Sequence, residues 1–465
     1  MQPVHIVVLA AGKGTRMRSA TPKVLHKVAG RPLIDHVLKA ASTLAPVTTS
    51  VVVGHEADRV RAHLQAWPAV RTVLQEPQLG TGHALLIAEP ALEGQRGTLV
   101  LLSGDVPLLS AASLAALVTR HQESGAAATV VTAMVERPSG YGRILRAGGE
   151  IARIVEERDA APAEREIKEI NAGIYALELE SLFDALRDIG AENTQREYYL
   201  PDLVAVYRRQ RKIVSTWTVA NPIEIRGINS RSELAEVGAV MRQRKHEELM
   251  AAGVTLVDPA ATYIDMDVEV GPDTIVHPGV HLEAATRIGA ACEIHAGSRI
   301  VNSELGDRVM VLNHSVITDT RIGDGCSVGP FAHLRPDSVL GEGARVGNFV
   351  ELKKTLLGAG AKANHLAYLG DAVIGENSNI GAGTITCNFD GTQKHPTTIG
   401  KGTFVGSNST LVAPVTIGDG SYVAAGSAIT EDVPADALAI GRSRQENKPG
   451  WAAKRRSAHP PKHKP

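Results

Sequence analysis

Hydrophobic and polar positions follow different patterns in the two halves of the chain. In the first half, short apolar runs at Val4–Leu9, Ser50–Val53, Leu99–Leu102 and Ala128–Thr132 are separated by amphipathic stretches such as Leu33–Leu44. Strands that alternate with helical patterns are typical of β/α units built on one sheet. The first half is therefore predicted to be an α/β domain.

In the second half, an aliphatic residue followed by glycine recurs at about six residues or a multiple of six, from Val270–Gly271 to Ile417–Gly418. A small or β-branched residue often follows three positions later, as at Thr274. Six residues cannot close a core alone, so such units must stack and bury each aliphatic side chain against the next turn. The repeat predicts a parallel β-solenoid, with glycine at tight corners where positive φ is tolerated.

The phase of this repeat slips around residues 363–368 and again at 386–398, and loops that leave a solenoid there would be natural binding places. Between the halves, Ser232–Ala252 has apolar residues at helical spacing and predicts a connecting helix. After Gly441 the chain is rich in Lys, Arg and Pro, which favours a disordered basic tail. The expected divisions are residues 1–231, 232–252, 253–441 and 442–465.

Composition narrows the classes of function. With 43% hydrophobic and 21% charged residues, the chain of 465 residues is expected to be globular. The 49 basic and 50 acidic residues argue against a chain-wide surface for nucleic acid. Three scattered cysteines, no charged leader and no apolar run near the roughly 18 residues of a membrane helix favour a cytoplasmic location and no membrane partner.

The segment Leu9–Met17 reads as a strand followed by a glycine-containing turn with two cations, Lys13 and Arg16. Such a turn presents backbone N–H groups and positive charge, so a polyphosphate ligand fits. It is neither a Walker A loop nor a dinucleotide fingerprint, because Met17 stands at the third glycine position. From spacing alone, a plain turn is an equal alternative, and Lys23 further along would by itself be a solvated lysine.

Asp105 follows the buried run Leu99–Leu102 by a short turn, at the edge where open α/β sheets bind ligands. Magnesium needs only one or two protein oxygens besides substrate phosphates, so Asp105 is a candidate ligand. A purely structural role for Asp105, in which it stabilises the turn before Pro107, is an equal alternative. The loop Gly80–His83 could similarly approach a flat base.

Taken together, these motifs match a family. The segments LAAGKGTRM, PKVLH, QEPQLGTGHA, LSGDVPL, GYGRI, IVEERDA, EINAGIY and GIN occur in this order before the hexapeptide repeat. In this, residues 4–442 closely resemble the bacterial bifunctional N-acetylglucosamine-1-phosphate uridyltransferase / glucosamine-1-phosphate acetyltransferases. The resemblance implies a nucleotidyltransferase domain with a Rossmann-like mixed sheet, followed by a left-handed parallel β-helix that carries the acetyltransferase.

For the first half, the resemblance implies transfer of UMP from UTP to N-acetylglucosamine 1-phosphate, with Mg²⁺ and release of pyrophosphate. The residues that it places around the nucleotide are Leu9, Ala10, Ala11, Gly12, Lys13, Arg16 and Lys23 at the phosphates and Gln75, Gly80 and Thr81 at the uracil. The remaining assignments are Asp105 and Asn229 to Mg²⁺, Gly142, Glu156 and Asn171 to the sugar phosphate, and Ser103 at a variable position of the same site.

For the second half, acetyl transfer to an amine needs a base with a pKa near neutrality, and His365 is the candidate. A lone histidine is more often structural than catalytic, but the resemblance favours a catalytic role here. Glucosamine 1-phosphate would meet Arg335, Lys353, Tyr368 and Asn379, and acetyl-CoA would lie against Ala382, Asn388, Phe389, Ser407, Ala425 and Arg442. Phe389 stands where the family usually has tyrosine, so a hydroxyl is missing.

The resemblance also implies a homotrimer, with the acetyl-transfer pocket between solenoids. The expected enzyme makes UDP-N-acetylglucosamine, a precursor for the cell wall. A second interpretation keeps only the nucleotidyltransferase and treats the solenoid as a scaffold for assembly or regulation. The polar residues around His365 disfavour it, because a scaffold has no need of them. A binding subunit with decayed sites is disfavoured by the intact Lys23, Asp105 and Asn229.

Overall fold

The computed structural model describes residues 2–459. It divides into two compact units, one ending at Lys245 and one beginning at His246. The division falls inside a long helix, α8 (Arg231–Ala251), which lies where the connecting helix was expected. Each unit has its own apolar core.

The first unit is built on one sheet of nine strands. Its strands are β1 (Val4–Ala10), β4 (Thr48–Val53), β5 (Val70–Leu74), β6 (Thr98–Ser103), β7 (Ala128–Met134), β8 (Arg143–Ala147), β9 (Glu150–Val155), β10 (Glu169–Glu178) and β11 (Val214–Thr218). The order is β11-β7-β10-β6-β1-β4-β5, with β8 paired to β10 and β9. Strand β10 runs antiparallel to β6 and β7, whereas β6, β1, β4 and β5 are parallel, so the sheet is mixed.

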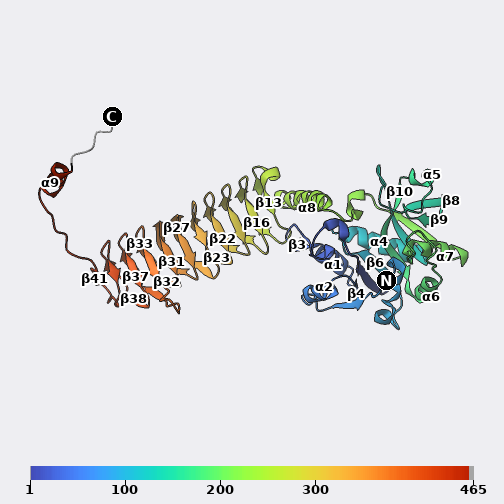
Figure 1. Cartoon of the computed structure of the whole chain (residues 1–465), viewed down its shortest axis with the longest axis horizontal. Helices are drawn as coiled ribbons and strands as arrows, with labels where there is room; N and C mark the ends of the chain where they lie inside the picture. Colours follow the sequence, from blue (N-terminus) through green and yellow to red (C-terminus); the bar gives the residue numbers. More distant parts are fainter. Residues whose placement is uncertain (1, 460–465) are drawn as a thin grey trace, which may run out of the picture. The chain divides into compact units, whose positions relative to one another are not determined.

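Successive residues of β1 point to opposite faces of this sheet, and both faces are buried. Ile6 and Val8 belong to one apolar cluster, and Val7 belongs to another. Helices account for this double burial, as expected for parallel strands. These helices are α1 (Leu33–Ser42), α2 (Ala57–Leu64), α3 (Thr81–Leu86), α4 (Ala111–Ser124), α5 (Pro162–Arg165), α6 (Leu182–Arg187) and α7 (Leu203–Arg209), and a small ribbon joins β2 (Lys27–Val28) to β3 (Arg31–Pro32) (Figure 1).

The second unit is a left-handed parallel β-helix whose coils stack along three sheets (Figure 1). The first sheet contains β12 (Thr255–Leu256), β15 (Ile275–Val276), β18 (Glu293–Ile294), β21 (Met310–Val311), β24 (Ser327–Val328), β27 (Arg345–Asn348), β30 (Lys362–His365), β33 (Asn379–Ile380), β36 (Phe404–Val405), β39 (Tyr422–Val423) and β41 (Leu438–Ala439). The second contains β13 (Tyr263–Ile264), β16 (His281–Glu283), β19 (Arg299–Val301), β22 (Val316–Thr318), β25 (His333–Leu334), β28 (Glu351–Lys353), β31 (Tyr368–Gly370), β34 (Ile385–Cys387), β37 (Thr410–Val412) and β40 (Ala428–Ile429). The third contains β14 (Glu269–Val270), β17 (Arg287–Ile288), β20 (Glu304–Leu305), β23 (Thr320–Ile322), β26 (Ser338–Leu340), β29 (Leu356–Leu357), β32 (Ala372–Ile374), β35 (Thr397–Ile399) and β38 (Val415–Ile417).

The hexapeptide pattern is confirmed, because its aliphatic positions form one continuous buried cluster from Val270 to Ile417. The expected reason for its glycines, a positive φ, holds at Gly329, where φ is 102°, but not at most repeat positions. Gly271 does not have a positive φ, but a Cβ there would lie 2.7 Å from the carbonyl carbon of Gly289 in the next coil. Close contact between coils therefore requires glycine, while positive φ also occurs at residues with side chains such as Asp273.

The two phase slips have different outcomes. At residues 363–368 no loop leaves the solenoid, because β30 and β31 follow each other and pair with the coil before them. The expectation of a loop there is wrong. Residues 388–396 do leave the coil between β34 and β35, and a bridge between Phe389 and Lys394 closes this loop.

Part of the tail is helical. Residues Trp451–Ala458 form helix α9, with the Arg455 guanidinium 5.4 Å from the centre of the Trp451 ring. No residue of this helix is buried, and the expectation of a disordered tail stays a prediction; residues 460–465 lie outside the described part of the chain. Among residues 2–459, no helix is long and apolar enough to cross a membrane. All three cysteines are free.

Candidate functional site

A cavity of about 1150 Å³ opens in the first unit, where the chain leaves the carboxyl ends of β1, β4, β5 and β6. This is the edge at which open α/β sheets bind ligands. Eleven of the expected residues line it: Leu9, Ala10, Ala11, Gly12, Lys13, Lys23, Gln75, Gly80, Thr81, Ser103 and Asp105. Five others do not line it: Arg16, which is exposed, and Gly142, Glu156, Asn171 and Asn229.

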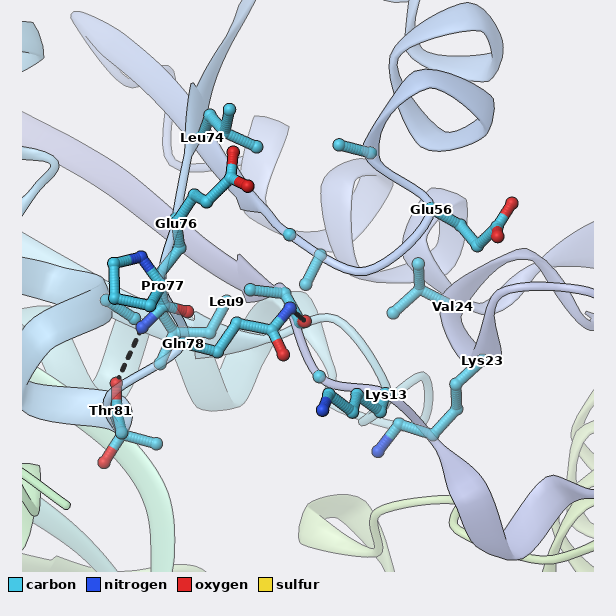
Figure 2. A pocket seen from close by; sticks show the side chains of 18 of the residues that line it. Leu9, Lys13, Lys23, Val24, Glu56, Leu74, Glu76, Pro77, Gln78 and Thr81 are labelled. Carbon is cyan, nitrogen blue, oxygen red and sulfur yellow. Dashed lines mark hydrogen bonds between the residues drawn. The ribbon is translucent and has the colours of Figure 1, made fainter. Parts of the chain in front are cut away.

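The loop after β1 depends on Gly14. Its φ is 60°, and a Cβ would lie 2.7 Å from the Cβ of Lys23. A side chain at this position would therefore be strained and would push Lys23 away. In Figure 2, Lys13 and Lys23 lie near each other, with Pro77 and Thr81 across the pocket. Two cations thus face the same space, as a polyphosphate would require.

Lys23, Asp105 and Asn229 form the charged centre of this edge. The Lys23 ammonium lies 2.5 Å from Asp105 Oδ2 and donates to Asn229 Oδ1 at 3.1 Å. Asn229 is held by its backbone N–H, which donates to Glu233 at 2.7 Å. Two hard oxygens therefore converge on one cation, which is the donor set that Mg²⁺ takes in nucleotide sites. Asp105 and Asn229 fit the expected metal.

The opposite wall is a loop that must pass close to another backbone segment. Gly80 has φ 106°, and a Cβ there would lie 2.7 Å from the carbonyl oxygen of Tyr198. Gly82 donates its N–H to that same oxygen at 2.8 Å, and Gln75 Nε2 donates to the Gly80 carbonyl at 3.0 Å. The glycines therefore let this loop pack against the Tyr198 backbone, with the buried Gln75 amide at the cavity wall.

Sequence reasoning missed residues that follow β4. Gly54 comes directly after that strand and lines the cavity, as does Glu56. Gln78 also lines it and donates to the carbonyl oxygen of Ala11 at 2.7 Å, which ties the two walls together. The signal was available, because parallel strands end at the same edge and Ser50–Val53 had been identified as a strand.

Gly142, Glu156 and Asn171 come together as a second group. Asn171 donates its N–H to the Gly142 carbonyl at 2.9 Å, and a Cβ at Gly142 would lie 3.2 Å from Glu156 Oε1. Burial, and then the nearby carboxylates of Asp202 and Asp159, raise the pKa of Glu156. A carboxyl group that is costly to ionise is suited to hydrogen bonding with a polar ligand.

In the solenoid, His365 ends β30 and is exposed. Its Nδ1 lies 2.6 Å from Oδ1 of Asn348, one coil earlier. An amide oxygen only accepts hydrogen bonds, so Nδ1 carries the hydrogen in the neutral ring and Nε2 keeps its lone pair. The imidazole of this exposed residue is therefore held in a tautomer whose Nε2 can accept a proton.

Cations gather on the neighbouring sheet. Arg335 donates to Glu351 at 2.9 Å, and Lys353 donates to Asp371 at 3.0 Å. Lys394, from the loop at 388–396, was missed in the sequence. Its interaction with the Lys353 ammonium lowers the pKa of Lys394. An anionic ligand would offset this repulsion between like charges.

Tyr368 and Asn388 meet above Gly370. A Cβ on Gly370 would lie 2.5 Å from the Tyr368 hydroxyl and 2.7 Å from Asn388 Nδ2, so only glycine allows this approach. Asn388 Nδ2 also donates to Asp371 Oδ2 at 2.5 Å. Asn379 lies on β33 in the sheet of His365. Tyr368 and Asn379 thus lie in neighbouring coils.

Four of the residues expected at acetyl-CoA, Ala382, Ser407, Ala425 and Arg442, follow one another along one corner of the solenoid. Asn408 donates its N–H to the Ala382 carbonyl at 2.7 Å, and Gly426 donates to Ser407 at 2.8 Å. Ala425 precedes Gly426, and a Cβ on Gly426 would lie 3.7 Å from Arg442 Cδ. Phe389 stands in the loop, 59% exposed. An extended ligand could follow this corner away from His365.

Three family models match parts of the chain. The MobA-like NTP transferase domain matches residues 6–197. The GMPPB C-terminal domain matches residues 263–353, and the hexapeptide repeat of succinyl-transferase matches residues 396–431. The first match contains all the residues that line the cavity, and the third begins at the last residue of the loop at 388–396.

Curated relatives match nearly the whole chain. The bifunctional protein GlmU of Trichlorobacter lovleyi is 50% identical, covering 97% of this chain and 98% of the relative. The protein of the same name from Pelobacter propionicus is 48% identical over 97% and 98% of the two chains. That of Streptococcus equi subsp. zooepidemicus is 48% identical over 98% of each.

Proposed function

This chain belongs to the family of the bifunctional GlmU proteins, and we propose how its residues divide two reactions between two sites. It is a bifunctional transferase of UDP-N-acetylglucosamine synthesis, with a nucleotidyltransferase unit and a hexapeptide acetyltransferase unit. In the proposed order, glucosamine 1-phosphate is acetylated on the solenoid and the product is then uridylylated in the first unit. Each step makes the group that the next site recognises.

In the first unit, Gly12, Lys13 and Lys23 would bind the phosphates of UTP, and Gln75 with the glycine loop would hold the uracil. Asp105 and Asn229 would hold Mg²⁺, which neutralises phosphate charge when bound. The sugar phosphate, positioned by the group around Glu156, would attack the α-phosphorus as pyrophosphate leaves. Alignment and charge neutralisation supply most of the catalysis in such transfers. The support is the convergence of Asp105 and Asn229 on one cation.

In the solenoid, Arg335, Lys353 and Lys394 would bind the phosphate of the amino sugar, and Tyr368 with Asn379 its polar groups. Nε2 of His365 would take a proton as the amine attacks the thioester carbonyl of acetyl-CoA, and coenzyme A leaves. The observation that carries this assignment is the orientation of His365 by Asn348 at 2.6 Å, beside a group of cations. A positioned imidazole is an effective base near neutral pH.

The chain is further proposed to act as a cytoplasmic homotrimer. Exposed apolar side chains on one corner support an interface: Phe331 and Phe349 stack with ring centres 5.4 Å apart, and Leu366 follows in the next coil. Bulky side chains are unusual at positive φ, yet all three have φ between 53° and 56°. Burial of these side chains against another copy would remove apolar surface from water next to His365.

A mixture of purified full-length protein, glucosamine 1-phosphate, acetyl-CoA, UTP and Mg²⁺ tests the assignment by mass analysis of the products. UDP-N-acetylglucosamine, coenzyme A and pyrophosphate are expected, and omission of acetyl-CoA should leave no UDP-sugar. If the protein uridylylates added N-acetylglucosamine 1-phosphate but never acetylates glucosamine 1-phosphate, the scaffold interpretation of the solenoid is correct instead.

A further inference from the structure

Three potential metal ligands, none of which belongs to either proposed site, meet on the outer face of the solenoid. Val276 of β15 pairs with Ile294 of β18, so the next residues, His277 and His295, stand side by side on neighbouring coils. Glu293 precedes His295 by two residues and therefore lies on the same face of the strand. In the part of the chain that the structure describes, this is the single group of three such side chains with ligand atoms within 4.8 Å of one another.

The spacing of these atoms suits a small metal ion. Zinc lies about 2.0–2.1 Å from imidazole nitrogen and carboxylate oxygen, so two ligands of a tetrahedral ion are about 3.3 Å apart. Glu293 Oε1 lies 3.0 Å from His277 Nε2 and 3.5 Å from His295 Nε2. The two rings are nearly parallel, at 6° with centres 4.8 Å apart. Each can turn about its terminal torsion, which has a broad energy well, to face a common point.

The hydrogen bonds of the group are incomplete. His277 Nε2 is hydrogen-bonded to Glu293, but His295 Nε2 is buried and has no hydrogen-bond partner in the structure. A buried polar atom without a partner costs free energy. A bound cation would give that nitrogen a partner and would neutralise the carboxylate.

We propose that His277, Glu293 and His295 bind a divalent transition-metal ion, with Zn²⁺ the ion tested first. Two imidazoles and one carboxylate suit zinc, whereas magnesium and calcium prefer oxygen ligands alone. Three protein ligands leave the fourth position of the ion open to water. The site is independent of both reactions assigned to the chain.

The ion would link two consecutive coils near the first coil of the solenoid. Coils of a solenoid contact only their neighbours, so the end coils gain stabilisation from one side only. A ligand that binds only the folded state stabilises it by mass action. Zinc would therefore resist fraying at this end of the solenoid.

Zinc binding to the full-length protein, after removal of metals with a chelator, measures the site directly. Titration with ZnCl₂ in competition with a chromophoric chelator should show one equivalent that His295→Ala and His277→Ala lack. Loss of an outer-shell partner already weakens metal sites by about 10–100-fold, so loss of a ligand should weaken this one at least about tenfold. Glu293→Gln should also weaken it.

His281→Ala is the matched control. His281 is also an outward-facing solenoid histidine, with Nδ1 4.0 Å from a carboxylate oxygen of Glu283, but its ring stacks on Tyr263 instead of on a second histidine. This variant should keep the full equivalent of zinc. Equal zinc uptake by wild type, His295→Ala and His277→Ala, or equal loss in His281→Ala, would overturn the proposal.

Two further measurements separate the site from folding defects. Co²⁺ in place of Zn²⁺ should give visible absorption bands of a tetrahedral ion in wild type and in His281→Ala, but not in His295→Ala. Zinc should raise the melting temperature of wild type and leave that of His295→Ala unchanged. If neither the bands nor the shift distinguishes the two proteins, the three side chains form no metal site.

Discussion

The two proposed sites are assembled from very different distances along the chain. In the first unit, Lys23 contacts Asp105 and Asn229, which are 82 and 206 residues away. In the solenoid, His365 contacts Asn348, only 17 residues away. Strand order of a mixed sheet brings the first set together, whereas the length of one coil brings the second together. A sheet site therefore depends on the whole unit, and a solenoid site on a few neighbouring coils.

Loss of His365 should separate the activities of the two sites most clearly. His365→Ala is expected to lower acetyl transfer by about 10²–10⁴-fold, because a positioned general base contributes that much. Uridylyl transfer should be unchanged, since no residue of that site lies in the solenoid. The two rates, measured separately with saturating substrates, check this. His333→Ala, which removes another exposed solenoid histidine, is the control. Equal loss of both activities would contradict two separate sites.

Asp105→Asn is the reciprocal test. It keeps the size of the side chain but removes the charge beside Lys23, so uridylyl transfer should fall by about 10²–10³-fold, as for other losses of charge stabilisation in a transition state. Acetyl transfer should be retained. Asp184→Asn changes a carboxylate that is 92% exposed in its side chain and serves as the control. Unchanged Mg²⁺-dependent release of pyrophosphate in Asp105→Asn would show that the metal assignment is wrong.

Matched core substitutions compare how far local destabilisation spreads in the two units. Leu101 and Leu352 are both fully buried, in the sheet and in the solenoid respectively. Leucine to alanine should cost about 2–5 kcal/mol at either position. Hydrogen exchange should rise throughout the first unit in Leu101→Ala, but mainly in the coils next to β28 in Leu352→Ala. Uniform exchange across the solenoid in Leu352→Ala would mean that it unfolds as one cooperative body.

The same difference explains what the sequence could and could not predict. The solenoid could be predicted from the spacing of Val270 and the equivalent aliphatic residues, since every repeat has the same short pattern. The cavity residues were found from strand ends, and Glu56 could have been found in the same way, because it follows the predicted strand Ser50–Val53. Asn348 could have been found, because the residue one coil before His365 must stand beside it. Lys394 could not, since its loop interrupts the repeat.

Asn348 gives a smaller and more local effect. It orients His365 without itself meeting the reacting atoms, so Asn348→Ala should lower kcat for acetyl transfer by about tenfold, the loss expected for one hydrogen bond of about 1.4 kcal/mol. KM for glucosamine 1-phosphate should be unchanged, because the cations that would bind the phosphate remain. A rise in KM without a fall in kcat would assign Asn348 to substrate binding instead.

The smallest effect is expected at Phe389, where the resemblance described for the sequence leads us to expect a tyrosine. The ring is 59% exposed at the rim of the loop, so a restored hydroxyl would compete with water for its hydrogen bonds. Phe389→Tyr should therefore lower KM for acetyl-CoA by only about two- to fivefold, the equivalent of about 0.5–1 kcal/mol. Phe389→Leu, which removes the aromatic ring, separates packing from hydrogen bonding. If Phe389→Tyr leaves KM unchanged while Phe389→Leu raises it, the aromatic ring alone contributes to binding. Residue 389 lies in a loop that interrupts the repeat, so neither substitution should disturb the coils on either side.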